Sequence, residues 1–370
     1  MKPQLTALPP DLVSLADYAR LAPDFIDPMV WAWLEGVSGD GEAARASIAS
    51  FANYAIYNRL LVDCRAGSTR TRLVGQDLAH PILFAPIGYQ HMLHPEGEVA
   101  SARGCLDTVH ITSSFASWPL EDIARAAAGP AWFQLYFQPE REQTEQLVRR
   151  AERAGYSAIM VTLDVPVKPS SRAAQQAGFA LPQGVEAVNL RGYEPARPIA
   201  VPPGESMILR GMMSYAPRID DLRWLRDLTD LPIIAKGVTH PDDARMLIEA
   251  GCDGLVVSNH GGRALEAAPA PLDRLSAIRA ALGPDVPLLI DGAIRSGADI
   301  FKALALGANA VMIGRPFMHA LAVAGSLGVA HMIKLLREDM ELVMALAGCP
   351  DMASITRAAI VTRSGEGATC

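Results

Sequence analysis

Eight short apolar runs recur along the chain, and each ends in Gly, Pro or a polar residue. They are rich in β-branched residues, as buried strands are. Amphipathic segments with a closing Gly separate most of them and indicate helices. The predicted strands are ILFAP (82–86), HITSS (110–114), AWFQLYF (131–137), SAIMVTLD (157–164), IIAKG (233–237), GLVVSNH (254–260), PLLIDG (287–292) and AVMIGRP (310–316). This pattern predicts an α/β fold.

The number of strands favours a closed parallel sheet, a (β/α)8 or TIM barrel. An open doubly wound sheet is the rival, because alternation of strands and helices does not by itself decide closure. We expect one domain that spans residues 1–370.

Residues 1–75 precede the first predicted strand and indicate a helical extension. Ser14 is its candidate N-cap, and an apolar stripe runs through Phe25, Val30, Trp33 and Leu34. We expect this extension to cover one end of the barrel.

Two further segments lie outside the repeating pattern. Residues 167–217 form an unusually long connection after the fourth strand, and from Leu181 to Pro217 it is rich in Pro, Gly and Met. A connection of this length in a compact domain is typical of an active-site lid. Residues 332–370 predict a closing helix, IKLLREDMELVMALAG, and a short polar tail.

Composition and charge narrow the class of protein. Half of the residues are hydrophobic and 20% are charged, which suits a compact enzyme. The net charge of -7 offers no basic face for nucleic acid or anionic lipid. The five cysteines form no CxxC pair, so we expect neither disulfides nor a metal site, and a reducing cytoplasm fits. The sequence predicts no signal peptide and no membrane span.

Polar residues close nearly every predicted strand. In barrels the active site is built from the carboxyl ends of the strands, so these residues are expected to converge on one rim. Singly, each has an ordinary structural explanation, such as capping the next helix. They are Ser113, Gln134, Tyr136, Thr162, Asp164, Lys236, Ser258, His260, Asp291, Gly314 and Arg315.

The last two strands carry the signature of a phosphate site. DGAIRSG (291–297) and IGRP (313–316) supply glycines for close backbone approach, and Arg295 and Arg315 for charge-assisted bonds. No GxGxxG turn follows the first strand. A flavin or a phosphorylated substrate is therefore favoured over NAD.

His260 is the strongest candidate for chemistry. It stands at a strand end after Asn259 and is followed by two glycines, which leave room beside the ring, and by Arg263. If Asp164 reaches the imidazole, it would fix the tautomer and stabilise the protonated ring. This arrangement predicts a general base.

The chain resembles the FMN-dependent 2-hydroxy acid oxidases and dehydrogenases, a family that includes glycolate, lactate and hydroxymandelate oxidases and mandelate dehydrogenase. The resemblance covers residues 15–350. It is carried by SNHGGR, by HPEGE after the first strand, and by FQLY, TLDVP, AKGV and FKALALGANAVMIGRP in later strands.

The resemblance implies roles for individual residues. His260 would take the proton of the substrate with Asp164 as its partner, Arg263 would bind the substrate carboxylate, and Tyr136 would contact the hydroxyl or carboxylate. Lys236 would lie by the N1 and O2 edge of the flavin. The remaining FMN contacts would come from Pro86, Ile87, Gly88, Ser113, Gln134, Thr162, Ser258, Asp291, Gly292, Arg295, Gly314 and Arg315.

Two positions depart from the family pattern. Trp33 stands where the family has a carboxylate-binding tyrosine, and Ser171 stands where it has an arginine, with Arg172 next to it. A lost charge-assisted bond costs about 1.5 to 3 kcal/mol of binding. We therefore expect a bulkier or carboxyl-modified substrate in a pocket shaped by Trp33, Phe115 and the lid, unless Arg172 replaces the missing arginine or the chain is a relative of ordinary activity.

Several alternatives stay open. The same barrel could serve a non-redox isomerase, or a flavin-binding protein without catalysis. The sequence does not decide the electron acceptor, which could be oxygen, a quinone or another protein. Nor does it decide whether a hydride or a proton leaves the α-carbon first. Homo-oligomers, often tetramers, are implied by the resemblance alone.

Overall fold

The computed structural model describes residues 1–167, 169, 171–197 and 199–363. Its main sheet has eight parallel strands in the order β4-β11-β10-β9-β8-β7-β6-β5. This order follows the chain without the reversal that a doubly wound sheet shows. The strands are β4 (Ile82–Phe84), β5 (His110–Ser113), β6 (Ala131–Leu135), β7 (Ile159–Thr162), β8 (Ile233–Val238), β9 (Gly254–Val257), β10 (Leu288–Asp291) and β11 (Ala310–Ile313).

The two end strands of this sheet meet. The backbone N–H of Phe84 in β4 donates to the carbonyl of Val109, the residue before β5, at 3.3 Å. This is weaker pairing than the registers of three or four residue pairs that join the other neighbours. The sheet is a nearly closed barrel, and the predicted fold class is confirmed.

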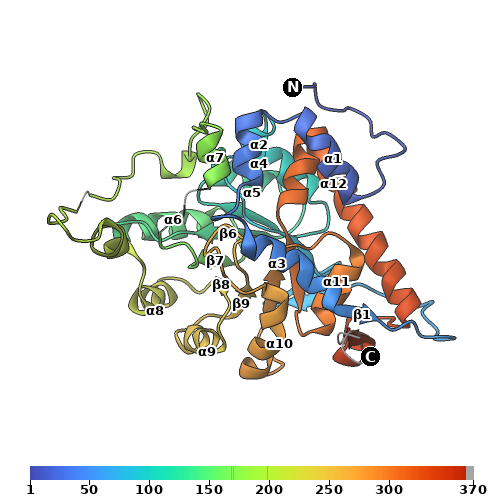
Figure 1. Cartoon of the computed structure of the whole chain (residues 1–370). Coiled ribbons are helices and arrows are strands. Elements are labelled where there is room, and N and C mark those ends of the chain that lie inside the picture. Colours follow the sequence, from blue (N-terminus) through green and yellow to red (C-terminus); the bar gives the residue numbers. More distant parts are fainter. Residues whose placement is uncertain (168, 170, 198, 364–370) are drawn as a thin grey trace, which may run out of the picture.

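Helices surround the barrel (Figure 1). They are α4 (Gly97–Gly104), α5 (Leu120–Ala126), α6 (Arg141–Arg153), α8 (Ile219–Leu228), α9 (Pro241–Glu249), α10 (Pro271–Leu282), α11 (Gly297–Ala305) and α12 (Arg315–Ala347). The closing helix starts earlier than the pattern indicates. Its first part, Phe317 to Gly325, is buried throughout, so it has no polar face to reveal a helical period. It kinks at Ala324 and Gly325.

Alternate strand residues fill two separate cores. Leu83, Trp132, Met160 and Leu289 point into the barrel and form one buried cluster. Their neighbours along the same strands pack outward against the helices. This is the alternation that a strand buried on both faces requires, and it explains why the strand sequences are continuous apolar runs.

The N-terminal segment reaches both ends of the barrel. Its helices are α1 (Leu15–Leu21), which Ser14 caps as predicted, α2 (Pro28–Glu35) and α3 (Glu42–Ser50). The hairpin of β2 (Thr71–Leu73) and β3 (Gln76–Leu78) was not predicted. Its apolar side chains join the cluster inside the barrel, and Gln76 accepts a hydrogen bond from the indole N–H of Trp132. The hairpin therefore closes the end of the barrel where the strands begin.

The connection from β7 to β8 extends away from the barrel (Figure 1). Its described part contains α7 (Arg172–Gln176), a 3-10 turn (Val188–Leu190), a π-helical turn (Met207–Gly211) and a 3-10 turn (Met212–Tyr215). The tail adds β12 (Ile360–Thr362), which pairs antiparallel with β1 (Tyr54–Ile56). The rest of the predicted tail, residues 364–370, lies outside the described residues.

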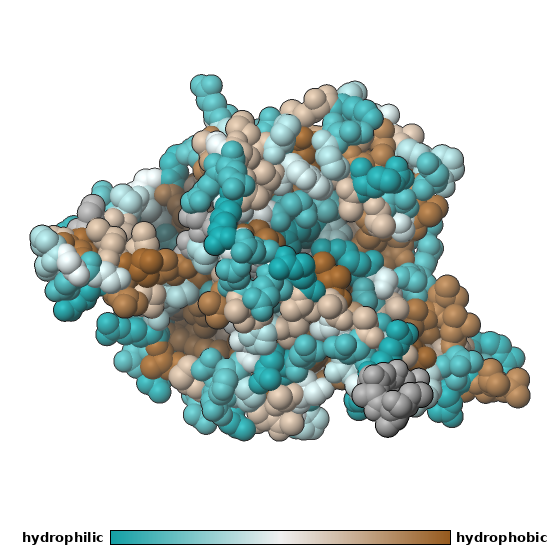
Figure 2. Space-filling view, viewed as in Figure 1, coloured by the Kyte–Doolittle hydropathy of each residue, from teal (hydrophilic) through white to brown (hydrophobic). Residues whose placement is uncertain are grey.

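The surface is mostly polar, with some apolar areas (Figure 2). One of these lies over the loop after β1 and the C-terminal end of α12, where Leu60, Leu61 and Leu346 are exposed. In the described part of the chain, only α12 is long and apolar enough to cross a membrane by length and composition. It is a core helix instead, since 67% of its most apolar window is buried.

Candidate active site

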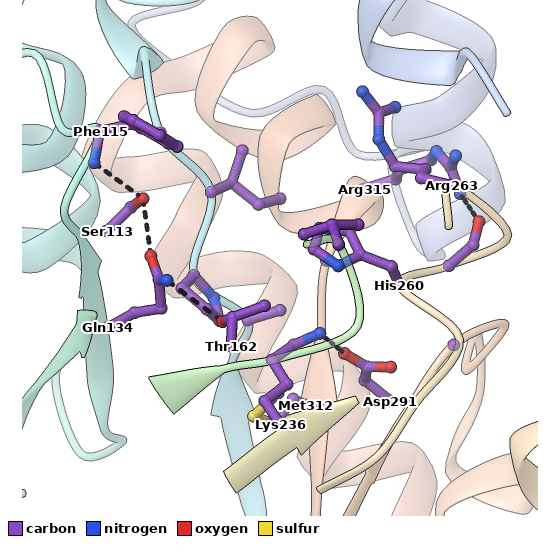
Figure 3. Close-up of a pocket in the computed structure, with 18 of the residues that line it drawn as sticks. Ser113, Phe115, Gln134, Thr162, Lys236, His260, Arg263, Asp291, Met312 and Arg315 are labelled. Atoms are coloured by element: carbon purple, nitrogen blue, oxygen red, sulfur yellow. Dashed lines mark hydrogen bonds and ion pairs between the residues drawn. The ribbon is translucent and has the colours of Figure 1, made fainter. Parts of the chain in front are cut away.

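A cavity of about 410 Å³ opens where the barrel strands end. Residues from every strand end and from α2 line it, as sequence patterning predicts for a barrel site (Figure 3). The predicted site residues in its wall are Trp33, Pro86, Ile87, Gly88, Ser113, Phe115, Gln134, Tyr136, Thr162, Lys236, His260, Arg263, Asp291, Gly292, Arg295, Gly314 and Arg315.

His260 and Asp164 form a pair at this rim. The imidazole Nδ1 lies 2.9 Å from Oδ1 of Asp164, and the aspartate is buried behind the histidine. Burial raises the pKa of Asp164, but the charge of Lys236 and the hydrogen bond from His260 outweigh burial and hold that pKa below its ordinary value. The carboxylate is thus ionised, and Nε2 of His260 is the nitrogen left for a ligand in the cavity.

The SNHGGR turn fixes the ring in place. The hydroxyl of Ser258 accepts from the backbone N–H of His260 at 3.0 Å, and Asn259 Oδ1 accepts from the N–H of Gly262 at 3.1 Å. His260 itself has a φ of 59°, which costs a non-glycine residue energy and recurs at functional sites. At Gly262 a Cβ would lie 2.7 Å from the Cβ of Ala44, so the turn requires glycine there.

Lys236 is buried between two carboxylates. Its Nζ lies 3.0 Å from Asp291 Oδ2 and donates to the hydroxyl of Ser258 at 3.0 Å. Burial disfavours the charged amine, yet Asp291 and Asp164 outweigh burial and raise the pKa of Lys236. The lysine therefore stays protonated, a fixed cation in the cavity wall next to His260.

A row of hydrogen bonds crosses the neighbouring strand ends (Figure 3). Ser113 donates to Gln134 Oε1 at 3.0 Å, and Gln134 Nε2 donates to the hydroxyl of Thr162 at 3.1 Å. Each of these side chains is buried, and each holds the next in one orientation. The row presents polar atoms of fixed direction to a flat ligand.

Three guanidinium groups form a cationic wall, which we define as Arg263, Arg295 and Arg315. Burial lowers the pKa of all three, and the charge of Arg315 adds to this for Arg263 and Arg295. The pKa of Arg263 falls to about 10, which leaves it charged at neutral pH. Repelling cations held this close predict an anionic ligand.

The cavity suits FMN. Asp291 Oδ1 is buried and has no hydrogen-bond partner among the described residues, as expected of an acceptor that awaits ligand hydroxyls. The cationic wall matches a phosphate, and the Ser113–Gln134–Thr162 row matches a ring with polar edges. The backbone at Gly88 packs closely against Phe115 in the cavity wall, because a Cβ at this position would lie 2.7 Å from Phe115.

Aromatic side chains make the rest of the wall. Phe115 packs against Tyr89 at 5.8 Å and Tyr136 at 5.2 Å between ring centroids, and burial raises the pKa of Tyr136 to about 12. Trp33 stacks on Phe179, a residue of the connection after β7, at 5.6 Å. Sequence reasoning assigned no site role to several lining residues, most of which lie within or just after predicted strands and motifs: Leu34, Ala85, Tyr89, Phe137, Gln138, Val165, Gly261, Ala293, Ile294 and Met312.

Arg172 is placed differently from the prediction. It begins α7, forms an ion pair with Asp40, and its side chain is 59% exposed. Ser171 caps the same helix, because its hydroxyl accepts from the N–H of Ala174. The helix start thus directs Arg172 outward. The structure does not bring it into the cavity, so on this geometry we expect that it does not replace the missing arginine.

Replacing Arg172 with alanine should therefore leave substrate binding nearly unchanged. We expect the KM to change by less than about twofold and the stability by less than about 1 kcal/mol, as for an exposed ion pair. Steady-state kinetics with the best substrate check this. A KM raised about tenfold or more would instead show that Arg172 binds the substrate carboxylate.

Glu98 connects two loops of the cavity wall. Its Oε1 accepts from the backbone N–H of Gln90, after β4, and from that of Ser117, after β5, both at 3.0 Å. Gln90 in turn donates through Nε2 to the carbonyl of Ile87 at 2.9 Å. Sequence reasoning noted HPEGE only as a motif. The last glutamate of this motif, Glu98, holds together the loops that follow β4 and β5, the two neighbouring strands with the weakest pairing in the barrel.

The stability of the protein should fall between about pH 4.5 and pH 7 because of Glu98. Burial raises its pKa to about 7, so the folded state holds this proton more tightly than the unfolded chain. The stabilisation is complete below the ordinary pKa and is lost as the pH rises through about 7, a loss of about 3 kcal/mol.

Glu98→Gln keeps the carbonyl acceptor but has no proton to lose. Its unfolding free energy, measured by urea denaturation of the holoenzyme, should decline less than that of the parent over this range. Parallel pH profiles for parent and variant would exclude Glu98 as the cause.

Comparison with known proteins agrees with the geometry. The sequence model of the FMN-dependent dehydrogenases matches residues 22–362. The chain is 51% identical to an L-lactate oxidase of Alicycliphilus denitrificans, over 94% of this chain and 96% of that protein. It is 36% identical to glycolate oxidase 5 of Oryza sativa subsp. japonica, over 96% and 97%.

A solved structure of mandelate oxidase with benzoyl-formic acid superposes with a TM-score of 0.86 at 37% identity, covering 95% of this chain and 99% of that one. These relatives use FMN and oxidise the CH–OH group of 2-hydroxy acids. Oxidation therefore replaces the non-redox isomerisation that the sequence left open. The chain belongs to the FMN-dependent dehydrogenases, and it is an FMN-dependent oxidoreductase that acts on 2-hydroxy acids.

Proposed function

We propose that the protein oxidises an (S)-2-hydroxy acid to the 2-oxo acid with His260 as the base. The observation that carries this is the pair of His260 Nδ1 and Asp164 Oδ1, 2.9 Å apart at the cavity rim. With Nδ1 used, Nε2 is free to take a proton from the substrate. FMN, when bound, supplies the acceptor for the two electrons.

Asp164 has a separate task. It stays ionised beside the ring, so it favours the tautomer that leaves Nε2 unprotonated. After proton transfer the same carboxylate faces a positive imidazolium and stabilises it. Lys236 is a cation that Asp164 and Asp291 share, and its charge helps to keep Asp164 ionised.

Arg263 is the proposed anchor of the substrate carboxylate. Its Nη1 donates to the carbonyls of Trp33, Leu34 and Gly36 at 2.7 to 2.9 Å. Nε and Nη2 have no partner among the described residues, and Arg263 lines the cavity. The arginine is therefore held by one nitrogen and offers the others to an anion.

The aromatic wall supports a substrate with a large apolar side chain. Trp33 replaces a hydroxyl donor with an indole ring that lies under Arg263, 5.3 Å from its guanidinium carbon, and on Phe179. Together with Phe115 and Tyr89 it gives a bulky side chain several rings to contact. A small acid such as lactate would reach few of these rings.

Anaerobic mixing with a panel of 2-hydroxy acids tests this proposal. We expect bleaching of the flavin absorbance with (S)-acids, and a kcat/KM at least tenfold higher for aryl or long-chain acids than for lactate or glycolate. Trp33→Tyr should narrow this preference. No bleaching with any member of the panel would contradict oxidation, and equal efficiency with lactate and larger acids would contradict the proposed substrate class.

We further propose oxygen as the acceptor that returns the enzyme to its starting state, because the similar proteins are named oxidases. Peroxide formation during turnover is the measurement.

Assembly into homo-oligomers, tetramers by family resemblance, and a cytoplasmic location stay predictions. The exposed leucines near the end of α12 support an assembly contact, which light scattering would detect.

A further inference from the structure

Glu35, the last residue of α2, lies at the cationic wall. Its Oε1 is 2.9 Å from Nε2 of His319, and its Oε2 is 3.9 Å from Nε of Arg315. Burial raises the pKa of Glu35, but the His319 hydrogen bond and the charges of Arg315 and Arg295 outweigh burial and lower it. Glu35 is therefore ionised, with 37% of its side chain exposed.

This carboxylate acts on all three arginines. The charge of Glu35 raises the pKa of Arg263, Arg295 and Arg315, in each case against the larger effect of burial. It therefore offsets part of the repulsion that these cations exert on each other before an anion binds. Figure 3 shows Arg263 and Arg315 side by side next to His260.

Glu35 does not set the orientation of Arg315. Backbone carbonyls do so: Nε donates to Leu34 at 3.1 Å, Nη1 to Gly261 at 3.0 Å and Nη2 to Gly36 at 3.1 Å. His319, one turn further along α12, is buried and holds Glu35 instead. The effect of Glu35 on the wall is therefore one of charge rather than of position.

We propose that Glu35 is an internal counter-ion of the cationic wall, which stabilises the cofactor-free protein and weakens the binding of the FMN phosphate. The phosphate would bring further negative charge to arginines that Glu35 already neutralises in part, and like charges that share a partner at close range repel. This inference rests on the proposed binding of the phosphate by Arg295 and Arg315.

The affinity of the apoprotein for FMN and for riboflavin, which lacks the phosphate, tests the inference by quenching of flavin fluorescence. Glu35→Gln should lower the Kd for FMN about tenfold, leave the Kd for riboflavin unchanged, and lower the melting temperature of the apoprotein. Glu35→Asp keeps the charge and should stay near the parent, which separates charge from packing. Glu338→Gln, the same change on the exposed part of α12, is the matched control.

Each of three results for Glu35→Gln would overturn the counter-ion role. These are a Kd for FMN that is unchanged or higher, a Kd for riboflavin that changes as much as that for FMN, and an apoprotein that is no less stable than the parent. Arg315→Met tests the underlying assignment separately, because it should weaken FMN and spare riboflavin. If Arg315→Met leaves the ratio of the two Kd values unchanged, the phosphate assignment fails. If it lowers FMN affinity selectively while Glu35→Gln does not raise it, only the counter-ion role fails.

Discussion

Replacing His260 with glutamine should lower kcat about 10³- to 10⁴-fold while FMN stays bound. Glutamine is close in size but cannot take a proton, and a positioned base contributes up to about 10⁴ in rate. The side chain is not part of the cationic wall, so the cofactor contacts proposed for Arg295 and Arg315 remain. Rapid mixing under anaerobic conditions measures the rate of flavin bleaching, and the absorbance spectrum of the purified variant measures the bound FMN.

Asp164→Asn provides the comparison for this variant. An amide cannot stabilise the imidazolium, so a large rate loss is expected here too, although the base is present. A His260→Gln variant that kept a rate within tenfold of the parent would show that another group takes the proton. Tyr136 would then be tested next, since it lines the same cavity.

Replacing Lys236 with methionine should destabilise the fold by about 3 to 5 kcal/mol, the cost of breaking a buried ion pair by removing one partner. Asp291, 3.0 Å away and almost fully buried, would lose its counter-charge, and Asp164 would lose the cation that keeps it ionised. The turnover of the folded fraction should fall about 10²- to 10³-fold, which is the loss expected when one fixed hydrogen-bond donor that stabilises developing negative charge is removed from an active site. Urea denaturation of the apoprotein measures the first effect.

A double variant separates the stability effect from the catalytic one. Lys236→Met combined with Asp291→Leu removes both charges and should recover much of the lost stability, because paired replacement of buried ions by apolar residues is often neutral. Its turnover should not recover. A single variant as stable as the parent would show that the contact between Lys236 and Asp291 does not stabilise the fold.

The barrel and most of the cavity wall could be predicted because parallel strands place their ends together. A polar residue at or near the end of an apolar run, such as Gln134 or Asp291, can therefore be placed at the rim of the barrel from the sequence alone. The same argument brings His260 and Asp164 to one rim, and the family resemblance implies their pairing. In the structure they are 2.9 Å apart.

Other parts depend on burial and on contacts between distant segments, which local pattern does not show. The first turns of α12 are buried on nearly all sides, so they show no helical period and the predicted closing helix began only at residue 332. Arg172 lies next to the expected position in sequence, yet the start of α7 turns it outward. Glu35 and Glu98 resemble ordinary surface glutamates until their partners on α12 and on two loops are known.

The N-terminal segment also has a consequence for how the protein is made. The backbone N–H of Leu5 donates to the carbonyl of Val323, Leu34 in α2 supplies a carbonyl to Arg263 and Arg315, and β1 pairs with β12. Residues 5–56 thus find these partners only after residues 263–362 have been synthesised. Contacts of such sequence separation form late in folding, so we expect the nascent chain to acquire affinity for FMN only once this later segment has been made.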